Sequence, residues 1–137
     1  MSTMNFSQYM AALKGIGADL DESAQRTLSQ MNAKGMEVTV KNTPVNKNPH
    51  IIGGTLKKGW HNDGTKREGK GYEARYSNNV YYAGYVNDGH RVVNKRHETV
   101  GYVNGFRMLE QGQQAAKDST DSIFNAEIRR VKSKGGW

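Results

Sequence analysis

A periodic stripe of apolar residues near the start of the chain constrains the fold more than any other feature. These residues recur at steps of three and four positions, which is the spacing of one face of an α-helix. They are Phe6, Tyr9, Met10, Leu13, Ile16, Leu20, Ala24, Leu28, Met31 and Gly35. Asn5 and Gln8 have the spacing of a capping box, so the helix is predicted to begin near residue 6. The Thr43-Pro44 pair is predicted to end it, because proline disfavours the helical conformation in the residue before it.

The segment that follows is rich in glycine and in basic side chains. Residues 46–71 contain six glycines and a proline, with few apolar anchors. This composition predicts a long mobile loop around one short ordered piece, residues 54–60. Residues 41–70 carry seven Lys or Arg and two acids, which is a net charge of +5 out of +7 for the whole chain. Most of the positive charge is therefore expected in this loop.

Three segments further along have the pattern of antiparallel strands. Residues 72–77 alternate between apolar and polar side chains, which predicts a strand with one buried face. Residues 80–86 and 99–103 are rich in aromatic and β-branched residues, which favour strands. Asparagine-containing turns follow these segments at 78–79, 87–89 and 104–105. We therefore expect a small, curved antiparallel sheet of three to four strands.

A second helical stripe begins at Met108. Its apolar and small residues again recur at helical spacing, at Leu109, Gly112, Ala116, Thr120, Phe124, Ile128 and Val131. Residues 132–137 are basic and glycine-rich, and they are predicted to form a flexible tail. The order of helix, loop, antiparallel strands and helix indicates an α+β fold rather than a parallel βαβ fold. At this length, residues 1–137 are expected to form one domain.

Composition restricts the partners and the compartment. The net charge of +7 favours a partner that presents phosphate, anionic lipid or an acidic protein surface. The chain has no cysteine, which excludes disulfides, thiolate metal ligands and cysteine nucleophiles. Neither a signal peptide nor a membrane span is expected from the sequence, so we expect a protein made in the cytoplasm.

Histidines and neighbouring charged residues are the candidates for chemistry. His50, His61, His90 and His97 lack the spacing of a metal site, and we expect no metal and no cofactor. A small ribonuclease would need a general base, a general acid and cations for the phosphate. Residues of these types cluster at His90, Arg91, Arg96, His97 and Glu98. A solvated, charged hairpin loop explains the same cluster, and no catalytic residue is predicted.

Three tyrosines stand close together in the segment YYAGYVNDGHRVV, residues 81–93. They have three possible uses, which are stacking on bases, forming the half-buried wall of a sheet, or meeting another protein. On a strand, Tyr81 and Tyr85 share one face and Tyr82 takes the other, so they do not form one flat platform. The pattern favours a strand and a turn over a stacking surface.

Four segments, in order, resemble a known protein family. They are NTPV at 42–45 after the long helix, GTLKKGW at 54–60, NNVYYAGYVNDGHR at 78–91, and VNGFRMLEQG at 103–112 before the last helix. Together with the elements between them they span about residues 5–130. In this order the chain resembles the head-to-tail joining proteins of tailed bacteriophages with long tails, also described as tail completion, neck or minor tail proteins.

The resemblance implies a structural, non-enzymatic subunit of the virion. Such a subunit is expected to form a ring of six copies at the neck, between the tail tube protein and the head connector or stopper protein. DNA is expected to pass through the ring without specific recognition. The alternative, from another functional class, is a basic nucleic-acid-binding protein or small ribonuclease that acts through the tyrosine segment and residues 90–98.

The resemblance and the charge pattern together give an expected assembly interface. A glycine-rich loop with a net charge of +5 is expected to become ordered against an acidic neighbour. One tyrosine face of residues 80–86 is expected to pack on the two helices, and the other to meet a neighbouring subunit. The predicted interface residues are Lys57, Lys58, Lys66, Arg67, Lys70, Tyr85, His90 and Arg91.

Overall fold

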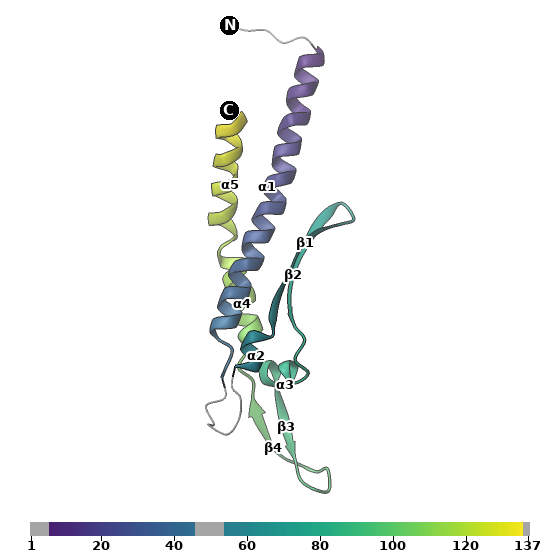
Figure 1. Cartoon of the computed structure of the whole chain (residues 1–137), viewed down its shortest axis with the longest axis vertical. Helices are drawn as coiled ribbons and strands as arrows, with labels where there is room; N and C mark the ends of the chain where they lie inside the picture. The colour runs from purple at the N-terminus through teal and green to yellow at the C-terminus, as the bar shows by residue number, and fades with distance from the viewer. Residues whose placement is uncertain (1–5, 46–53, 136–137) are drawn as a thin grey trace.

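One long N-terminal helix and two C-terminal helices form the body of the protein. The computed structural model describes residues 6–45 and 54–135. Helix α1, Phe6–Lys41, lies beside α4, Met108–Asp118, and α5, Thr120–Gly135. The two C-terminal helices run antiparallel to α1, so the start of α1 and the end of α5 point the same way (Figure 1).

Both helical predictions are confirmed, with differences at the ends. Helix α1 begins at residue 6 as predicted, while its predicted cap Asn5 lies outside the described residues. The second helical region begins at Met108 as predicted, but it is interrupted at Ser119. Helix α5 then continues to Gly135, so residues 132–135 of the predicted tail are helical.

A β-hairpin of β1, Trp60–Glu68, and β2, Gly71–Asn78, lies along α1 (Figure 1). Asn32 on α1 fixes the hairpin, because its Nδ2 donates hydrogen bonds to Asn62 Oδ1 at 3.0 Å and to the Arg75 carbonyl at 3.1 Å. The strand predicted over 72–77 is confirmed in β2.

The loop predicted over residues 46–71 is wrong for the part that the structure describes. The short ordered piece is helix α2, Thr55–Lys58, and β1 begins two residues after it ends. Residues 46–53 lie outside the described part of the chain. Gly64 sits at the register shift of the hairpin and Gly69 in its turn, with φ of 85° and 57°. These glycines therefore serve a bulge and a turn, where positive φ favours glycine.

A short helix takes the place of the predicted strand over 80–86, and a second hairpin follows it. Helix α3 is Ala83–Asp88, so the strand predicted over 80–86 is wrong. The chain continues into β3, Gly89–Val93, which pairs with β4, Thr99–Asn104. The strand predicted over 99–103 is confirmed in β4. Within residues 6–45 and 54–135, the four strands form two separate two-stranded sheets, and not one sheet of three to four strands.

Local hydrogen bonds explain why the tyrosine segment is not a strand. Asn78 Oδ1 accepts the Val80 N–H at 3.0 Å, which turns the backbone immediately after β2. The Ala83 and Val86 N–H groups then donate to the carbonyls of Val80 and Tyr82 in helical turns. Aromatic residues favour strands only where a pleated neighbour is present, and no neighbouring strand pairs with this segment among the described residues.

The core is small, and its buried apolar side chains among the described residues are spread over α2, β2, α4 and α5. The buried apolar side chains among the described residues are Leu56, Tyr76, Met108 and Val131. The Tyr76 hydroxyl lies 2.9 Å from Thr39 Oγ1 and accepts a hydrogen bond from Gln113 Nε2 at 2.9 Å. A Cβ on Gly35 would lie 3.2 Å from the Gly112 carbonyl oxygen, so these glycines allow α1 and α4 to approach closely.

The buried side of α1 is more polar than its apolar stripe predicts. Its buried polar residues are Ser23, Thr27, Asn32 and Thr39, while Leu20 and Met10 of the predicted stripe are exposed. Asn32 contacts the first hairpin and Thr39 contacts Tyr76, whereas Ser23 faces α5 and accepts a hydrogen bond from Arg130 at 3.3 Å. Glu127 of α5 is only 5% exposed. The Glu127 carboxylate accepts hydrogen bonds from Arg26 at 3.0 Å, from Arg130 at 2.9 Å and from Gln30 at 3.0 Å. A buried polar network therefore joins the two long helices.

The molecule is long and thin, as Figure 1 shows. The chain of 15.3 kDa exposes 10108 Å² of accessible surface, whereas a compact monomer of that mass exposes roughly 7100 Å². Much apolar surface that a compact fold would bury is consequently left for contact with other molecules.

Candidate assembly interface

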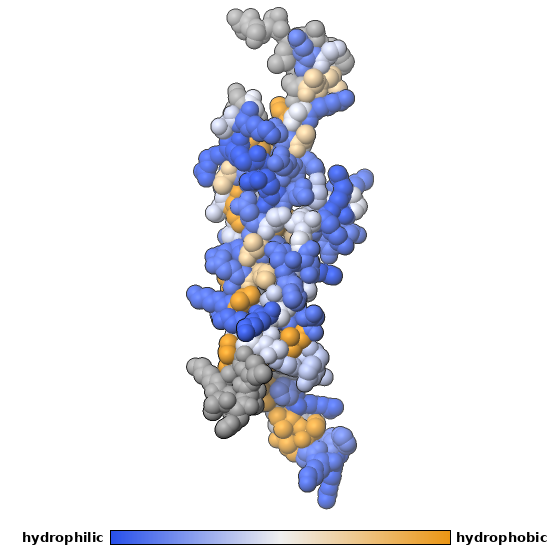
Figure 2. All heavy atoms as spheres, in the orientation of Figure 1, coloured by the Kyte–Doolittle hydropathy of each residue, from blue (hydrophilic) through white to orange (hydrophobic). Residues whose placement is uncertain are grey.

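The β3–β4 hairpin projects from one end of the body and exposes apolar side chains. Every residue of β4 is exposed, with Val100 at 63% and Tyr102 at 64%. Val92, Val93, Val103 and Phe106 are exposed as well. Figure 2 shows these apolar atoms gathered at the lower end of the molecule, next to hydrophilic atoms at the hairpin tip. Contiguous exposed apolar surface of this kind marks an interaction site.

The base of this hairpin is held close to α3. Phe106 N–H donates to the Val86 carbonyl at 2.9 Å, and Arg107 N–H to the Asn87 carbonyl at 3.0 Å. Gly89 has φ of 84°, and a Cβ on Gly105 would collide with the Asn87 and Asp88 backbone. The hairpin therefore leaves the body in a fixed direction.

Buried Asn87 connects α3 to the start of α4. Its Oδ1 accepts the Leu109 N–H at 2.9 Å, and its Nδ2 donates to the Glu110 carboxylate at 3.0 Å. The side chain thus satisfies one of the backbone donors that a helix N-terminus leaves free. Sequence reasoning assigned Asn87 only to a turn, because no local signal indicates a cap for a helix that begins more than twenty residues later.

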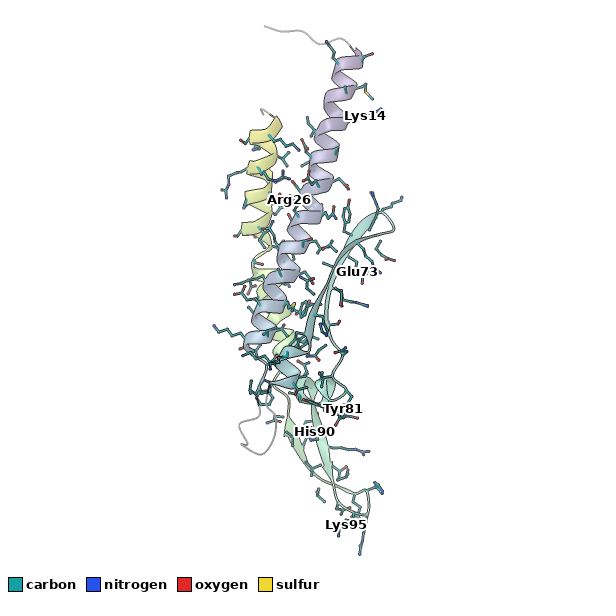
Figure 3. All side chains as sticks on the ribbon, in the orientation of Figure 1. Lys14, Arg26, Glu73, Tyr81, His90 and Lys95 are labelled. Atoms are coloured by element: carbon teal, nitrogen blue, oxygen red, sulfur yellow. The ribbon has the colours of Figure 1, made fainter. Side chains whose placement is uncertain are left out.

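The tip of the hairpin presents basic side chains. Asn94 Oδ1 accepts the N–H groups of Arg96 and Glu98 at 2.9 and 3.0 Å, which closes the turn. His97 adopts a φ of 63° within it. Lys95 lies at the far end of the hairpin (Figure 3), and neither Lys95 nor Arg96 forms an ion pair with another described residue.

A groove of about 700 Å³ lies between α3 and the hairpin. Its lining is mostly apolar and aromatic, and consists of Tyr82, Tyr85, Val86, Gly89, His90, Arg91, Val93, His97 and Tyr102. The rings of Tyr85 and His90 are 6.1 Å apart, edge to face. The structure therefore brings together three of the predicted interface residues, namely Tyr85, His90 and Arg91.

The cluster considered for ribonuclease chemistry is only partly assembled. His90, Arg91 and His97 line the groove, whereas Arg96 and Glu98 are absent from its lining. Within the described residues, neither imidazole hydrogen-bonds to a carboxylate that would orient it as a general base. The same part of the chain holds no group of three or more metal-ligand side chains.

The tyrosines of residues 80–86 are not arranged as predicted, with one face in the core and the other toward a neighbouring subunit. Tyr81 is 90% exposed and points away from the helices (Figure 3), and Tyr85 is 62% exposed. The expectation that one tyrosine face of 80–86 packs on the helices is therefore wrong for these two side chains. Tyr76 of β2 supplies the buried aromatic ring, tilted against Trp60 with ring centroids 5.8 Å apart.

The other predicted interface residues lie on two further elements. Lys57 and Lys58 form the last turn of α2. Lys66 and Arg67 lie on β1, each 4.0 Å from a carboxylate, those of Glu73 and Asp21 respectively. Lys70, in the turn of the first hairpin, has no ion-pair partner among the described residues. These five cations are thus separate from the groove lined by Tyr85, His90 and Arg91.

Tyr72 fastens the first hairpin to α1. Its hydroxyl donates to Asp21 Oδ2 at 2.5 Å, and this hydrogen bond raises the pKa of Tyr72 above its usual value. The Arg67 guanidinium lies 5.5 Å from the Tyr72 ring centre. Arg67 therefore has partners within its own protomer, which the sequence pattern did not indicate.

Comparison with known proteins identifies a family. The model of the family described as "Bacteriophage HK97-gp10, putative tail-component" matches residues 6–89, more than half of the chain. The match covers α1 to α3 and ends at the first residue of β3. No curated protein sequence and no solved structure matches significantly. None of the described helices is long and apolar enough to cross a membrane.

Proposed function

This chain belongs to the HK97-gp10-like family of bacteriophage tail components, and we propose that it joins the tail to the head connector as a non-enzymatic neck subunit. As a tail component it is a virion protein. In this proposal residues 1–137 act as a single joining domain, made in the host cytoplasm. Six copies form a ring between the connector or stopper protein and the tail tube protein. DNA passes through the ring without specific recognition.

The observation that carries the proposal is the apolar β3–β4 hairpin projecting from a thin body. A two-stranded hairpin is marginally stable alone, and here no described residue of β4 is buried. Its apolar side chains would be a liability on a protein that worked as a free monomer. A subunit that is covered by neighbours in a virion resolves this problem.

The groove and the basic side chains of α2 and the first hairpin are the proposed contacts with neighbouring proteins. The groove that holds Tyr85, His90 and Arg91 is apolar enough for a protein contact, and the Arg91 guanidinium adds a positive charge to its lining. Lys57, Lys58, Lys66, Arg67 and Lys70 provide further basic contacts on α2 and the first hairpin. Interfaces of this composition, with tyrosine and arginine at an apolar patch, are typical of protein association.

Electron microscopy of particles with this gene interrupted tests the joining role. We expect DNA-filled heads and separate tails, and intact particles when a wild-type copy is supplied. Complete, infectious particles without the gene product would refute the proposal. A complementing copy with Glu98→Gln separates the roles further, because Glu98 is exposed and lies outside the groove lining. A nuclease that uses this carboxylate would lose its function, while a neck subunit with an intact groove and apolar hairpin would still join heads and tails.

A further inference from the structure

We propose that the β3–β4 hairpin of one copy binds a second copy at the face of α4 and α5 that carries Asp118, Asp121 and Phe124. This inference rests on the proposed ring and names the two surfaces through which neighbouring copies meet. The hairpin is the basic and apolar surface of the pair, and the helical face is the acidic and apolar one.

The hairpin requires a partner that offers both apolar contact and negative charge. Val100 and Tyr102 are mostly exposed. Arg91, Lys95 and Arg96 form no ion pair with the described residues. A second hairpin would bring like charges together, which costs several kcal/mol across an interface. The partner surface is therefore a different one, and it carries carboxylates.

The carboxylates of that partner surface can be found on the same chain among the acidic residues that lack a cationic partner. Seven acids already have cationic partners within 4.0 Å, namely Asp19, Asp21, Glu37, Glu73, Asp88, Glu110 and Glu127. The acids without such a partner among the described residues are Glu22, Asp63, Glu68, Glu98, Asp118 and Asp121. Of these, Asp118 at the end of α4 and Asp121 in the first turn of α5 are three residues apart, and both are exposed.

An exposed aromatic side chain completes this acidic face. Phe124 stands one turn beyond Asp121 on α5 and is 46% exposed. Asp121 has no hydrogen-bond or ion-pair partner among the described residues, and Asp118 accepts only a hydrogen bond from Gln114 at 2.8 Å. Asp121 and Phe124 are three residues apart on α5 and share a helical face, and Asp118 ends α4 just before it. Both carboxylates therefore lie on the N-terminal side of one apolar contact point.

The two surfaces complement each other in charge and in polarity. Arg91 and Arg96 would meet Asp118 and Asp121, while Val100 or Tyr102 would cover Phe124. Because the two surfaces of the contact differ, each copy can bind one neighbour on each side. A contact of this heterologous kind closes into a ring or extends as a filament.

Charge reversal tests the contact in the phage whose own gene is interrupted. Asp118→Lys with Asp121→Lys, and separately Arg91→Glu with Arg96→Glu, should each lower the plaque titre about 100-fold or more, because like charges then face each other. The variant with all four changes should recover titre to within about tenfold of wild type, since complementarity is restored. Full titre with either double variant, or no recovery with all four changes, would overturn the inference.

A matched control and a folding check accompany this test. Lys34→Glu with Glu37→Lys exchanges the charges of an exposed pair outside both surfaces and should leave the titre unchanged. Thermal melting of the purified variants should stay close to wild type, because the substituted side chains are exposed.

Cross-linking in purified particles gives a second readout. The chain has no cysteine, so Val100→Cys with Phe124→Cys provides a unique pair for a short bismaleimide. We expect dimers and higher multimers, and none with Val100→Cys and Gln25→Cys. If the protein is in the particles but the first pair gives no multimers, this inference is overturned and the joining role stands. If the protein is absent from particles, the joining role itself fails.

Discussion

At the scale of single residues, Asn87 is the side chain that sets the direction of the projecting hairpin. It is buried at the point where α3, the hairpin and α4 meet, and its two polar atoms contact the first turn of α4. A residue in this position links the body to the candidate interface without touching any partner itself.

Replacing Asn87 with alanine should destabilise the protein by about 1–2 kcal/mol, because the Leu109 N–H loses its cap and the Glu110 carboxylate loses a donor. Denaturant unfolding measures this change. Asn79→Ala is the matched control, since Asn79 is exposed and should shift stability by less than about 0.5 kcal/mol. Equal stability of both variants would contradict the role given to Asn87.

Glu127 should make stability depend on pH in the acid range. Burial alone raises the pKa of the Glu127 carboxyl, but hydrogen bonds from Arg130, Arg26 and Gln30 outweigh burial, so its pKa lies below the usual value. A lowered folded-state pKa contributes stability above the unfolded pKa, and this contribution is lost as pH falls through the folded pKa. The free energy of unfolding should therefore drop as pH falls below about 4.5.

Glu127→Gln should be less stable than wild type at pH 7 and should flatten that acid dependence. Glu37→Gln is the control, because Glu37 is 71% exposed in a 4.0 Å pair with Lys34 and contributes little. Denaturant titrations at a series of pH values compare the three proteins. An unchanged slope in Glu127→Gln would show that another group carries the acid dependence.

At the scale of elements, close contact between α1 and α4 depends on glycine. A Cβ on Gly112 would overlap Thr39 Oγ1 and lie 2.9 Å from the Tyr76 hydroxyl. Gly112→Ala should therefore destabilise the protein by about 1–3 kcal/mol, even though alanine favours helices. Gly17→Ala should have the opposite effect, a gain of up to about 1 kcal/mol, because nothing lies within 4 Å of its added Cβ. If both variants raised the melting temperature, or both lowered it, the result would contradict this packing.

The projecting hairpin should contribute to assembly and hardly to folding. Val100→Ser with Tyr102→Ser removes apolar surface that is already exposed, so the melting temperature should change little. The same variant should fail to join heads and tails in the complemented phage. A variant that melts much earlier, or that assembles normally, would show that the hairpin packs within the protomer or has no contact in the virion.

The elements also show what the sequence could predict. The helices were predictable because their periodicity extends over many residues, as from Leu109 to Val131. Helix α3 was not predictable, because a short aromatic run does not distinguish a strand from a helix. Hydrogen bonds of the Asn78 and Asn87 side chains decide its conformation. Strand β1 was predicted as loop because its segment contains Gly64 and Gly69, which serve a bulge and a turn, whereas β2 was predicted correctly from its alternation.

The candidate site was predictable only in part. Tyr85, His90 and Arg91 were grouped from their closeness in sequence, and they do line one groove. The exposed apolar face of β4 could not be foreseen, because alternation suggests a buried face and only the three-dimensional arrangement shows that nothing covers it. The partners of Lys66 and Arg67 come from β2 and α1, at sequence distances that no local pattern reveals.

At the scale of the whole molecule, a thin core and a large surface explain why assembly is central to this account. The exposed surface exceeds that of a compact monomer of equal mass by a wide margin. The family match ends at Gly89, so the β3–β4 hairpin, α4 and α5 all lie beyond the matched residues. We expect the helical body to hold each copy in place and the hairpin to make the contact with a neighbour.

Cryo-electron microscopy of the intact virion tests the joining role most directly. The reconstruction should show α1 and the α4–α5 pair repeated around a ring of six between the head connector and the tail tube, with each β3–β4 hairpin on the next copy. Density for this chain elsewhere in the tail, or a neck ring built entirely from other proteins, would contradict the account.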